Sequence, residues 1–442
     1  MNDEHHANGS GVPLGTLLAL MLAVFTVSIG FGVVLPLLPG FVESLVKSRD
    51  GSSGTALHTG LLTSTYVLAL FLFAPFWGRV SDRYGRRSIL VLGVLGFAGS
   101  MFAFSLVHSL PAFYFERFVS GVFAAAVTPV ASAVIGDLAA NDEARGRRLT
   151  MISVAGIAGF LVGPMLGLLI ARISAGLLQT VGPEGLLARP LSVTAILALP
   201  VAAAIALAVP GASHLAATRL KVATAAGSGR MVFKLLALAF IVSGSVGVFE
   251  VGLALRGKQE LGLSAGQIAL MFTECSVVMI AVQALVFSPL VKSASTRMLI
   301  NPALAILAVG LFLVPRASNF TLMLVVIGAV AASAGIILPI VTYWISTKAG
   351  NAQGAELGKQ TSAASLGSAV GSAAGGLLFD APFPGASFVL AAGLTIIGIG
   401  LSWRLPRLLA GRNPPMLDRL AGTNSSKAVR MELHPAKGPL AK

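Results

Sequence analysis

The chain has 442 residues, of which 55% are hydrophobic, 11% are charged and 50 are glycine. Soluble domains carry about 25% charged residues, so this composition cannot furnish a water-facing surface and excludes a soluble globular protein. The net charge of +14 lies mostly in short segments between apolar runs, which is typical of membrane orientation and not of nucleic-acid binding. A single cysteine, Cys275, excludes an intrachain disulfide, and the six histidines show no metal-ligand spacing. We therefore expect no metal, no other cofactor and no nucleic-acid partner.

Twelve apolar segments are long enough to cross a hydrocarbon core of about 30 Å as helices. In chain order they are Leu14–Leu38, Thr59–Trp77, Ser88–Val107, Ala112–Leu138, Leu149–Ile170, Leu191–Val209, Met231–Leu255, Ala265–Leu290, Met298–Val314, Phe320–Ile345, Leu357–Phe379 and Ser387–Trp403. They predict an all-α integral membrane protein whose twelve transmembrane helices form two pseudo-symmetric six-helix bundles.

Basic residues predict the orientation of these spans. Most lysines and arginines fall in alternate loops and in the C-terminal segment, which places both termini in the cytoplasm. The leader carries Asp3 and Glu4 and no basic stretch, so we expect no cleavable signal peptide. The expected organisation is a cytoplasmic N-terminus (1–13), an N-terminal bundle (14–210), a cytoplasmic linker (211–230), a C-terminal bundle (231–405) and a basic cytoplasmic tail (406–442). The expected location is the cytoplasmic (inner) membrane.

The two halves share a set of small residues and prolines in the same order. The paired positions, 208 to 215 residues apart, are Ser28 with Ser243, Gly32 with Gly247, Pro75 with Pro289, Pro129 with Pro339, Gly163 with Gly371 and Gly167 with Gly375. Duplicated halves of this kind are a transporter architecture, with a site near the midplane between them.

The segment between the second and third spans reads Gly-Arg-Val-Ser-Asp-Arg-Tyr-Gly-Arg-Arg. Its informative positions are Gly78, Asp82, Arg83, Gly85, Arg86 and Arg87. The glycines permit a tight turn and close backbone approach, while the carboxylate pairs with arginines or caps the next helix. This string resembles the signature loop of the major facilitator superfamily, which implies a loop that takes part in conformational switching. The alternative is a basic loop that only sets orientation.

Two further segments resemble the twelve-span drug:proton antiporter branch of that superfamily. One is Arg117 with Gly121 in the fourth span, similar to the Arg-x-x-x-Gly element. The other is the fifth-span set Gly159, Gly163, Pro164 and Gly167, similar to the antiporter motif. The chain departs from that motif at Leu168, where a glycine is usual. The resemblance implies proton-coupled efflux, although close packing of small residues also explains a glycine ladder.

Ionisable residues inside spans are costly and are functional candidates by default. We expect Glu250 to carry the proton, because burial disfavours its charged form; the alternative places it at the outer interface beside Arg256. Glu274 is a second candidate, or a carboxyl hydrogen-bonded between helices. Arg117 stays charged and acts electrostatically. Glu116 completes the proton-coupling set. It lies about 100° around the helix from Arg117 and need not pair with it; the alternative places it at the outer interface.

For the substrate cavity we expect the aromatic residues Phe25, Phe31, Phe249, Tyr343 and Trp344, whose walls suit amphipathic molecules. The leading hypothesis is a monomeric secondary transporter in the lipid bilayer, exchanging protons for a small organic substrate. The alternatives are a metabolite or sugar facilitator, or a membrane sensor or scaffold. The spans hold no nucleophile–base pair and no nucleotide-binding loop, so we expect no enzyme.

Overall fold

The computed structural model describes residues 12–47, 54–104, 107, 109–139, 142–177, 185–211, 229–286, 293–348 and 353–405. Within these ranges the chain forms helices and turns and contains no strand. Most of the expected N-terminus (1–13), most of the linker (211–230) and the whole expected tail (406–442) lie outside them.

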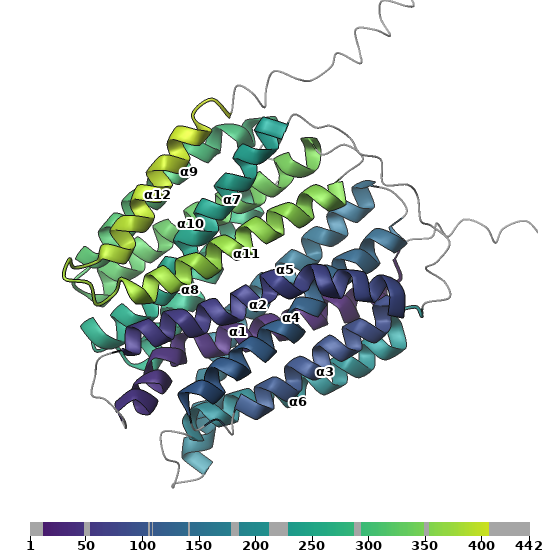
Figure 1. The fold of residues 1–442 in the computed structure, drawn as a ribbon, viewed down its shortest axis with the longest axis horizontal. Helices are drawn as coiled ribbons and strands as arrows, with labels where there is room; N and C mark the ends of the chain where they lie inside the picture. The colour runs from purple at the N-terminus through teal and green to yellow at the C-terminus, as the bar shows by residue number, and fades with distance from the viewer. Residues whose placement is uncertain are drawn as a thin grey trace, which may run out of the picture.

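The helices follow one another along the chain (Figure 1). They are α1 (Leu14–Lys47), α2 (Thr55–Tyr84), α3 (Arg86–Phe104), α4 (Leu110–Leu138), α5 (Asp142–Leu177), α6 (Gly185–Ala208), α7 (Gly229–Leu255), α8 (Ala265–Val286), α9 (Ile300–Leu313), α10 (Phe320–Lys348), α11 (Gln353–Leu377) and α12 (Ala386–Ser402). A π-helical turn (Arg256–Glu260) extends α7, and 3₁₀ turns (Ser293–Leu299 and Val314–Arg316) flank α9.

The all-helical membrane class predicted from composition is confirmed. Ten helical segments within the described residues are long and apolar enough to cross a membrane, and α12 is a shorter apolar helix. Glycine, serine and alanine dominate α11, which is not among the ten. The number of crossings, twelve, stays a prediction.

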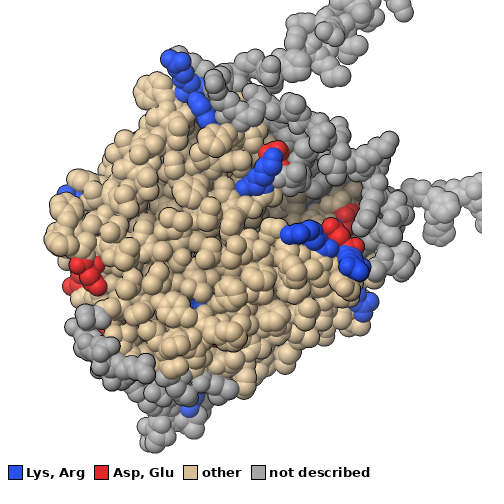
Figure 2. Space-filling model, in the orientation of Figure 1, with Lys and Arg blue, Asp and Glu red and all other residues tan. Residues whose placement is uncertain are grey.

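Charge is distributed as a membrane protein requires. Figure 2 shows Lys, Arg, Asp and Glu gathered toward two opposite ends of the visible face, with a broad belt between them made almost entirely of other residues. Many of the large apolar side chains are exposed, among them Leu72, Leu169, Val309 and Ile396. A belt of this composition suits lipid, because hydrocarbon does not penalise exposed apolar surface.

Buried apolar residues form two large clusters, one for each half of the chain. The first cluster comes from α1–α6 with a single contribution from α11, Ala369. The second comes from α7–α12 with a single contribution from α1, Leu35. In Figure 1 the purple-to-blue helices lie together on one side and the green-to-yellow helices on the other.

The packing of helices repeats from one half to the other. In the first half α1 packs on α5, α2 on α4, and α3 on α6. In the second half the same contacts join α7 to α11, α8 to α10, and α9 to α12. Between the halves α2 packs on α11 and α5 packs on α8. These two contacts are equivalent under the repeat, because α8 is the counterpart of α2 and α11 is the counterpart of α5. The contact pattern is thus the one expected for a duplicated chain.

The halves meet at one end of the molecule. We call the end that carries the α2–α3 turn at Gly85 the loop end, and the opposite end the far end. At the far end Gly60 of α2 lies against Gly376 of α11, so closely that a Cβ on Gly376 would lie 2.7 Å from the Gly60 Cα. The far-end residues Ala56, Val251 and Leu255 form a small apolar cluster beside this contact. The far end is therefore closed by direct backbone contact between α2 and α11.

Candidate functional site

A cavity of about 370 Å³ lies between the two halves, lined by residues of both. The first half contributes Val27, Ser28, Phe31, Tyr66, Val67, Leu70, Ala124, Thr128 and Phe160. The second half contributes Ser243, Val246, Glu250, Leu338, Ala364, Ser365 and Ser368. Seven helices (α1, α2, α4, α5, α7, α10 and α11) supply these walls. A mostly apolar enclosure of this size with a few polar groups is typical of a small-molecule site.

Aromatic rings from the first half form a continuous stack in the cavity wall. The ring of Phe31 lies 5.3 Å from that of Tyr66 at 18°, and 5.9 Å from that of Phe160 at 29°. Phe160 in turn meets Phe272 of α8 edge to face, at 6.3 Å between centroids. The stack thus reaches from α2 across to the second half and gives the cavity an aromatic wall.

Glu250 supplies the only charged side chain among the cavity-lining residues. Within the described part of the chain its carboxylate has neither a hydrogen-bond donor nor an ion-pair partner. Its neighbours Phe249 and Val251 are buried in the protein. The expected alternative, a carboxylate beside Arg256, is not found, because Arg256 pairs with Glu260 and donates from Nη2 to the Ala317 carbonyl at 3.0 Å. Glu250 is therefore a carboxylate held inside a largely apolar cavity.

The other aromatic residues expected in the cavity lie elsewhere. Phe249 and Trp344 are buried in the second apolar cluster. Tyr343 packs against that cluster, and its ring lies 5.4 Å from that of Trp344. Phe25 packs against the first cluster. Of the five, only Phe31 lines the described cavity.

Glu116 and Arg117 form a buried ion pair, which differs from the expectation that they need not meet. Both side chains are almost fully buried; Nε of Arg117 donates to Oε2 of Glu116 at 2.7 Å and Nη2 donates to Oε1 at 2.9 Å. Long side chains can turn back along the helix, and two unpaired buried charges would each cost several kcal/mol. Glu116 is therefore buried inside the first half.

This ion pair lies directly behind the cavity wall. The guanidinium of Arg117 lies 5.7 Å from the centre of the Tyr66 ring and 5.0 Å from that of Phe104. Gly121, one turn further on, permits the approach, since a Cβ there would overlap the Tyr66 carbonyl. The Arg-x-x-x-Gly segment thus packs α4 on α2 at Tyr66, whose ring lines the cavity.

Glu274 lies outside the cavity, on α8 facing α10. Its Oε2 is buried without a hydrogen-bond partner, and its Oε1 would lie 3.5 Å from a Cβ on Gly328. The neighbouring residues Cys275 and Ser276 are buried. The interhelical hydrogen bond considered for Glu274 is not found among the described residues.

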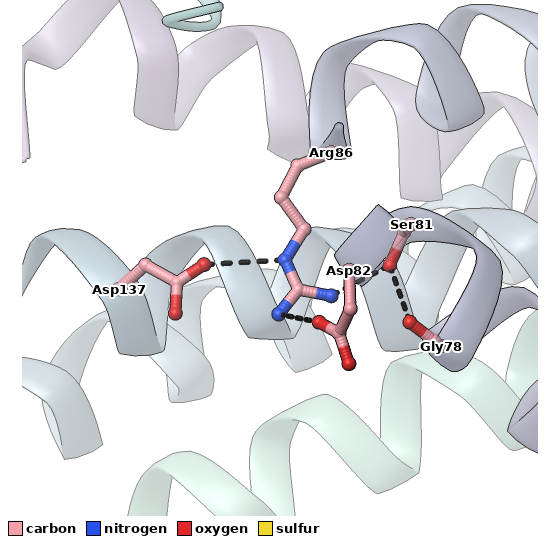
Figure 3. Close-up of polar contacts among 5 residues, drawn as sticks. All are labelled: Gly78, Ser81, Asp82, Arg86 and Asp137. Carbon is pink, nitrogen blue, oxygen red and sulfur yellow. Dashed lines mark hydrogen bonds and ion pairs between the residues drawn. The ribbon is translucent and has the colours of Figure 1, made fainter. Parts of the chain in front are cut away.

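The α2–α3 turn is organised around Arg86 (Figure 3). Its Nη2 lies 2.6 Å from Oδ1 of Asp82, its Nε 3.2 Å from Oδ2 of Asp137, and its Nη1 donates to Oγ of Ser81 at 2.6 Å. One guanidinium therefore connects the end of α2, the start of α3 and the end of α4. Asp137 and Arg86 are 51 residues apart in sequence, and only the packing of α4 beside the turn brings them together.

The two glycines of this turn differ in role. Gly85 ends α2 with φ of 93°, a conformation that side chains disfavour, and its N–H donates to the Ser81 carbonyl at 3.1 Å. Gly78 lies inside α2, and no atom lies within 4 Å of a Cβ placed on it. The expectation that Gly78 permits a turn or a close approach is thus wrong for this structure. Arg83 and Arg87 are exposed.

The antiporter-like segment of α5 packs on α1 through its glycines. A Cβ on Gly159 would overlap the Phe25 carbonyl, and one on Gly163 would lie 2.8 Å from the Ile29 carbonyl. Gly167 is looser, with its nearest neighbour at 3.3 Å, and Pro164 lies 3.2 Å from a Cβ on Gly32. In the second half Gly371 packs in the same way on Gly244. These glycines hold two helices in backbone contact beside the cavity.

Several cavity residues were missed from the sequence, chiefly Tyr66, Phe160 and the serines of α7 and α11. Tyr66 is a polar aromatic in the middle of an apolar span, and Phe160 directly follows Gly159 of the antiporter-like segment. Both signals were available. The serines lie among many other small residues of glycine-rich helices, and only the packing of those helices distinguishes them.

Comparison with known proteins gives a consistent result along nearly the whole chain. The family model described as Major Facilitator Superfamily matches residues 20–221 and 235–433. Multidrug resistance protein 2 of Bacillus subtilis (strain 168) is 27% identical over 394 residues, covering 88% of this chain and 95% of that protein. Quinolone resistance protein NorA of Staphylococcus aureus (strain COL) is 24% identical over 384 residues, covering 87% of this chain and 94% of that protein.

Solved structures share the fold at lower identity. The human organic anion transporter MFSD10 (TETRAN) superposes with a TM-score of 0.65 at 20% identity, covering 88% of this chain and 100% of that one. A bacterial homolog of the human lysosomal transporter Spinster, in an inward-facing and unoccupied conformation, gives 0.63 at 16% identity, covering 90% and 98%.

Proposed function

Because the chain belongs to the major facilitator superfamily, a family of membrane transporters, we propose that it exports a small amphipathic organic compound across the cytoplasmic membrane in exchange for protons. The proposal includes twelve crossings in two six-helix bundles, both termini in the cytoplasm, and a monomer that works by alternating access. Glu250 carries the proton in this mechanism.

One observation carries the proposal: a carboxylate without a partner lies in an apolar cavity between the two halves. A charged carboxylate in such a place is unfavourable, so it gains from either a proton or a cationic substrate. The two ligands therefore compete for one group, which is the simplest basis for exchange. No second charged side chain lines the described cavity to neutralise Glu250.

The arrangement of the halves supports alternating access. The far end is closed where α2 meets α11, and Phe160 of α5 meets Phe272 of α8 beside the cavity. Figure 2 shows the surface hollowed between the two halves close to the charged groups at one end. With the loop end in the cytoplasm, this is an inward-open state. The repeated packing supports a motion in which each half moves as a unit, because α1–α5 and α7–α11 are joined through glycine contacts.

The relatives support a drug-like substrate. The two quoted above are named for multidrug and quinolone resistance, and each is matched over nearly its whole length. At about a quarter identity they support the class of compound and not one molecule. The aromatic stack of the cavity supports the same class, since flat apolar surfaces bind such rings.

The remaining candidates act around this site. Arg117 with Glu116 fixes the electrostatic environment behind Tyr66, and Glu274 is a second candidate carboxylate in the second half, with its Oε2 buried and unpartnered. Asp82, Arg83, Gly85, Arg86 and Arg87 form the α2–α3 loop that joins three helices at the cytoplasmic end. The glycines of α5 hold it on α1.

The test uses inverted membrane vesicles that contain the protein and are energised to form a pH gradient. A panel of lipophilic cations, neutral drugs and metabolites is added in turn, and a pH-sensitive dye reports discharge of the gradient. We expect protein-dependent discharge by amphipathic compounds, and loss of it with Glu250→Gln. Asp380→Asn, an exposed carboxylate between α11 and α12, is the matched control and should behave as the parent.

The outcomes separate the alternatives. Discharge that survives Glu250→Gln but not Glu274→Gln would move proton coupling to α8. Transport of a metabolite without any pH change would favour a facilitator. Silence across the panel, with the protein inserted and folded, would favour a sensor or scaffold and contradict the proposal.

A further inference from the structure

On the second-half side of the cavity, three serine hydroxyls are left without hydrogen bonds among the described residues. They belong to Ser243 of α7 and to Ser365 and Ser368 of α11. Within the described residues none of the three donates to or accepts from any group. Hydroxyls elsewhere in the helices mostly donate to a backbone carbonyl one turn earlier, as Thr59 does to Thr55 and Ser276 to Phe272. The cavity serines are thus free to bond a ligand.

The aromatic rings of the cavity all come from the first half, and its one charged lining residue comes from the second. All three rings, those of Phe31, Tyr66 and Phe160, belong to the first half. The second half supplies no ring but presents the three serines and Glu250. Ser28 and Thr128 add two hydroxyls on the first-half side. A flat ligand that fills the cavity therefore lies against the rings of the first half, with its charge toward Glu250 of the second.

Backbone contacts between α7 and α11 fix the depth of these groups. A Cβ on Gly244 would lie 3.2 Å from the Gly367 carbonyl, and one on Gly247 would lie 2.6 Å from the Ser368 carbonyl. Ser243 is therefore level with the serines of α11 to within about one helical turn. Glu250 is seven residues further along α7, or about 10 Å deeper toward the far end.

We propose that Ser243, Ser365 and Ser368 form a hydroxyl site that binds a hydrogen-bond acceptor of the substrate, about 10 Å from the positive charge held at Glu250. The inference rests on the proposed function and narrows its substrate class. The preferred substrate is a flat aromatic cation with its charge at one end and a carbonyl, ether or similar oxygen at the other. The serines are positioning residues; they select and orient the molecule while Glu250 exchanges it for a proton.

The physical basis is the cost of leaving polar groups unpaired. When a ligand displaces water from the cavity, hydroxyls without an acceptor lose their hydrogen bonds. An acceptor at the right depth restores them, whereas an apolar end does not. Each such bond between neutral groups changes affinity by about threefold to tenfold.

The test compares two probes that differ by one oxygen. The first is an acetyl-biphenyl with a dimethylaminomethyl group at its far end, and the second is the ethyl-biphenyl that lacks only the carbonyl oxygen. Binding of each to the purified full-length protein is measured by calorimetry. The variant is Ser365→Ala with Ser368→Ala. The control is Thr361→Ala on the same helix, whose hydroxyl already donates to the Leu357 carbonyl at 3.0 Å and does not line the cavity.

We expect the double serine variant to lower the acetyl-to-ethyl affinity ratio by about threefold to tenfold, with little change for the ethyl probe. A general packing defect would weaken both probes together and leave the ratio unchanged. An unchanged ratio, or an equal fall with Thr361→Ala, overturns the inference. If the ratio is unchanged while vesicles still show Glu250-dependent discharge, the proposed function stands alone. If the parent protein neither binds the probes nor discharges the gradient with any compound, both fall.

Discussion

The contact between Gly60 and Gly376 predicts that a single added methyl group shifts the balance between molecules whose far end is closed and molecules whose far end is open. A Cβ on Gly376 would overlap the Ala56 carbonyl and lie 2.7 and 2.8 Å from Cα and N of Gly60. Each of these neighbours is a backbone atom, so none can rotate away. Gly376→Ala therefore penalises the state in which the far end is closed.

The size of the effect follows from the cost of overpacking. Extra methyl groups in a tight interface cost about 1–3 kcal/mol. The gain in helix propensity from replacing glycine is the same in both states of α11 and cancels. Because the far-end contact is absent when that end opens, the penalty falls on the closed state alone. The ratio of far-end-open to far-end-closed molecules should rise by about fivefold to a hundredfold.

The assay is simple to set up because the chain has a single cysteine, Cys275, to remove. Cys275→Ser gives a cysteine-free background, and Ser243→Cys places a reporter in the cavity wall. A membrane-impermeant maleimide is applied to intact cells and, separately, to inverted vesicles. The parent should label from the vesicle side, and Gly376→Ala should shift labelling toward the outside of the cell. Gly393→Ala on α12, where no atom lies within 4 Å of the new Cβ, is the control.

Equal labelling ratios in Gly376→Ala and its parent, with both proteins folded, would refute the reasoning. That result would mean that the α2–α11 contact does not distinguish the two states. A shift of the same size with Gly393→Ala would refute it too, since the change would then not depend on close packing.

Two further predictions concern the ion pairs. Arg86→Gln removes the group that joins Asp82 to Asp137 and should lower stability by about 1 kcal/mol, seen as a lower melting temperature in detergent; an exposed-site control, Arg83→Gln, should change it less. Glu116→Gln leaves Arg117 buried without a counter-charge and should cost about 3–5 kcal/mol in chemical unfolding, whereas Glu116→Leu combined with Arg117→Met should restore most of the loss. A double variant no better than Glu116→Gln would contradict the second prediction.

Helix positions follow from the sequence more reliably than helix ends. The predicted spans starting at Ala265 and Phe320 begin where α8 and α10 begin. In contrast, α1 continues nine residues beyond the predicted Leu38, through Pro39 to Lys47, and α2 continues through Gly78 to Tyr84. The length of an apolar segment shows where the hydrocarbon core of the bilayer ends. The backbone hydrogen bonds of a helix persist into the polar interface, so hydropathy cannot show where the helix ends.

The candidate site was predictable where a single residue carried the signal. Glu250 stands out as a carboxylate in an apolar span and does line the cavity. Pairings were harder, because they depend on which helices meet. Asp137 pairs with Arg86 because α4 packs beside the α2–α3 turn. Glu116 pairs with Arg117 because both side chains are buried. The proton-carrying roles themselves remain predictions.

The glycine contacts between α1 and α5, and between α7 and α11, separate two kinds of position in this chain. At Gly159, Gly163 and Gly371 even a methyl group would overlap backbone, so natural selection has almost no latitude there. The cavity side chains, such as Phe31 and Ser368, belong to the same set of helices but line the cavity. Their replacement leaves the interlocked backbones untouched. A protein built this way can acquire new substrates over evolutionary time by exchanging wall residues, while the moving parts that carry them are inherited unchanged.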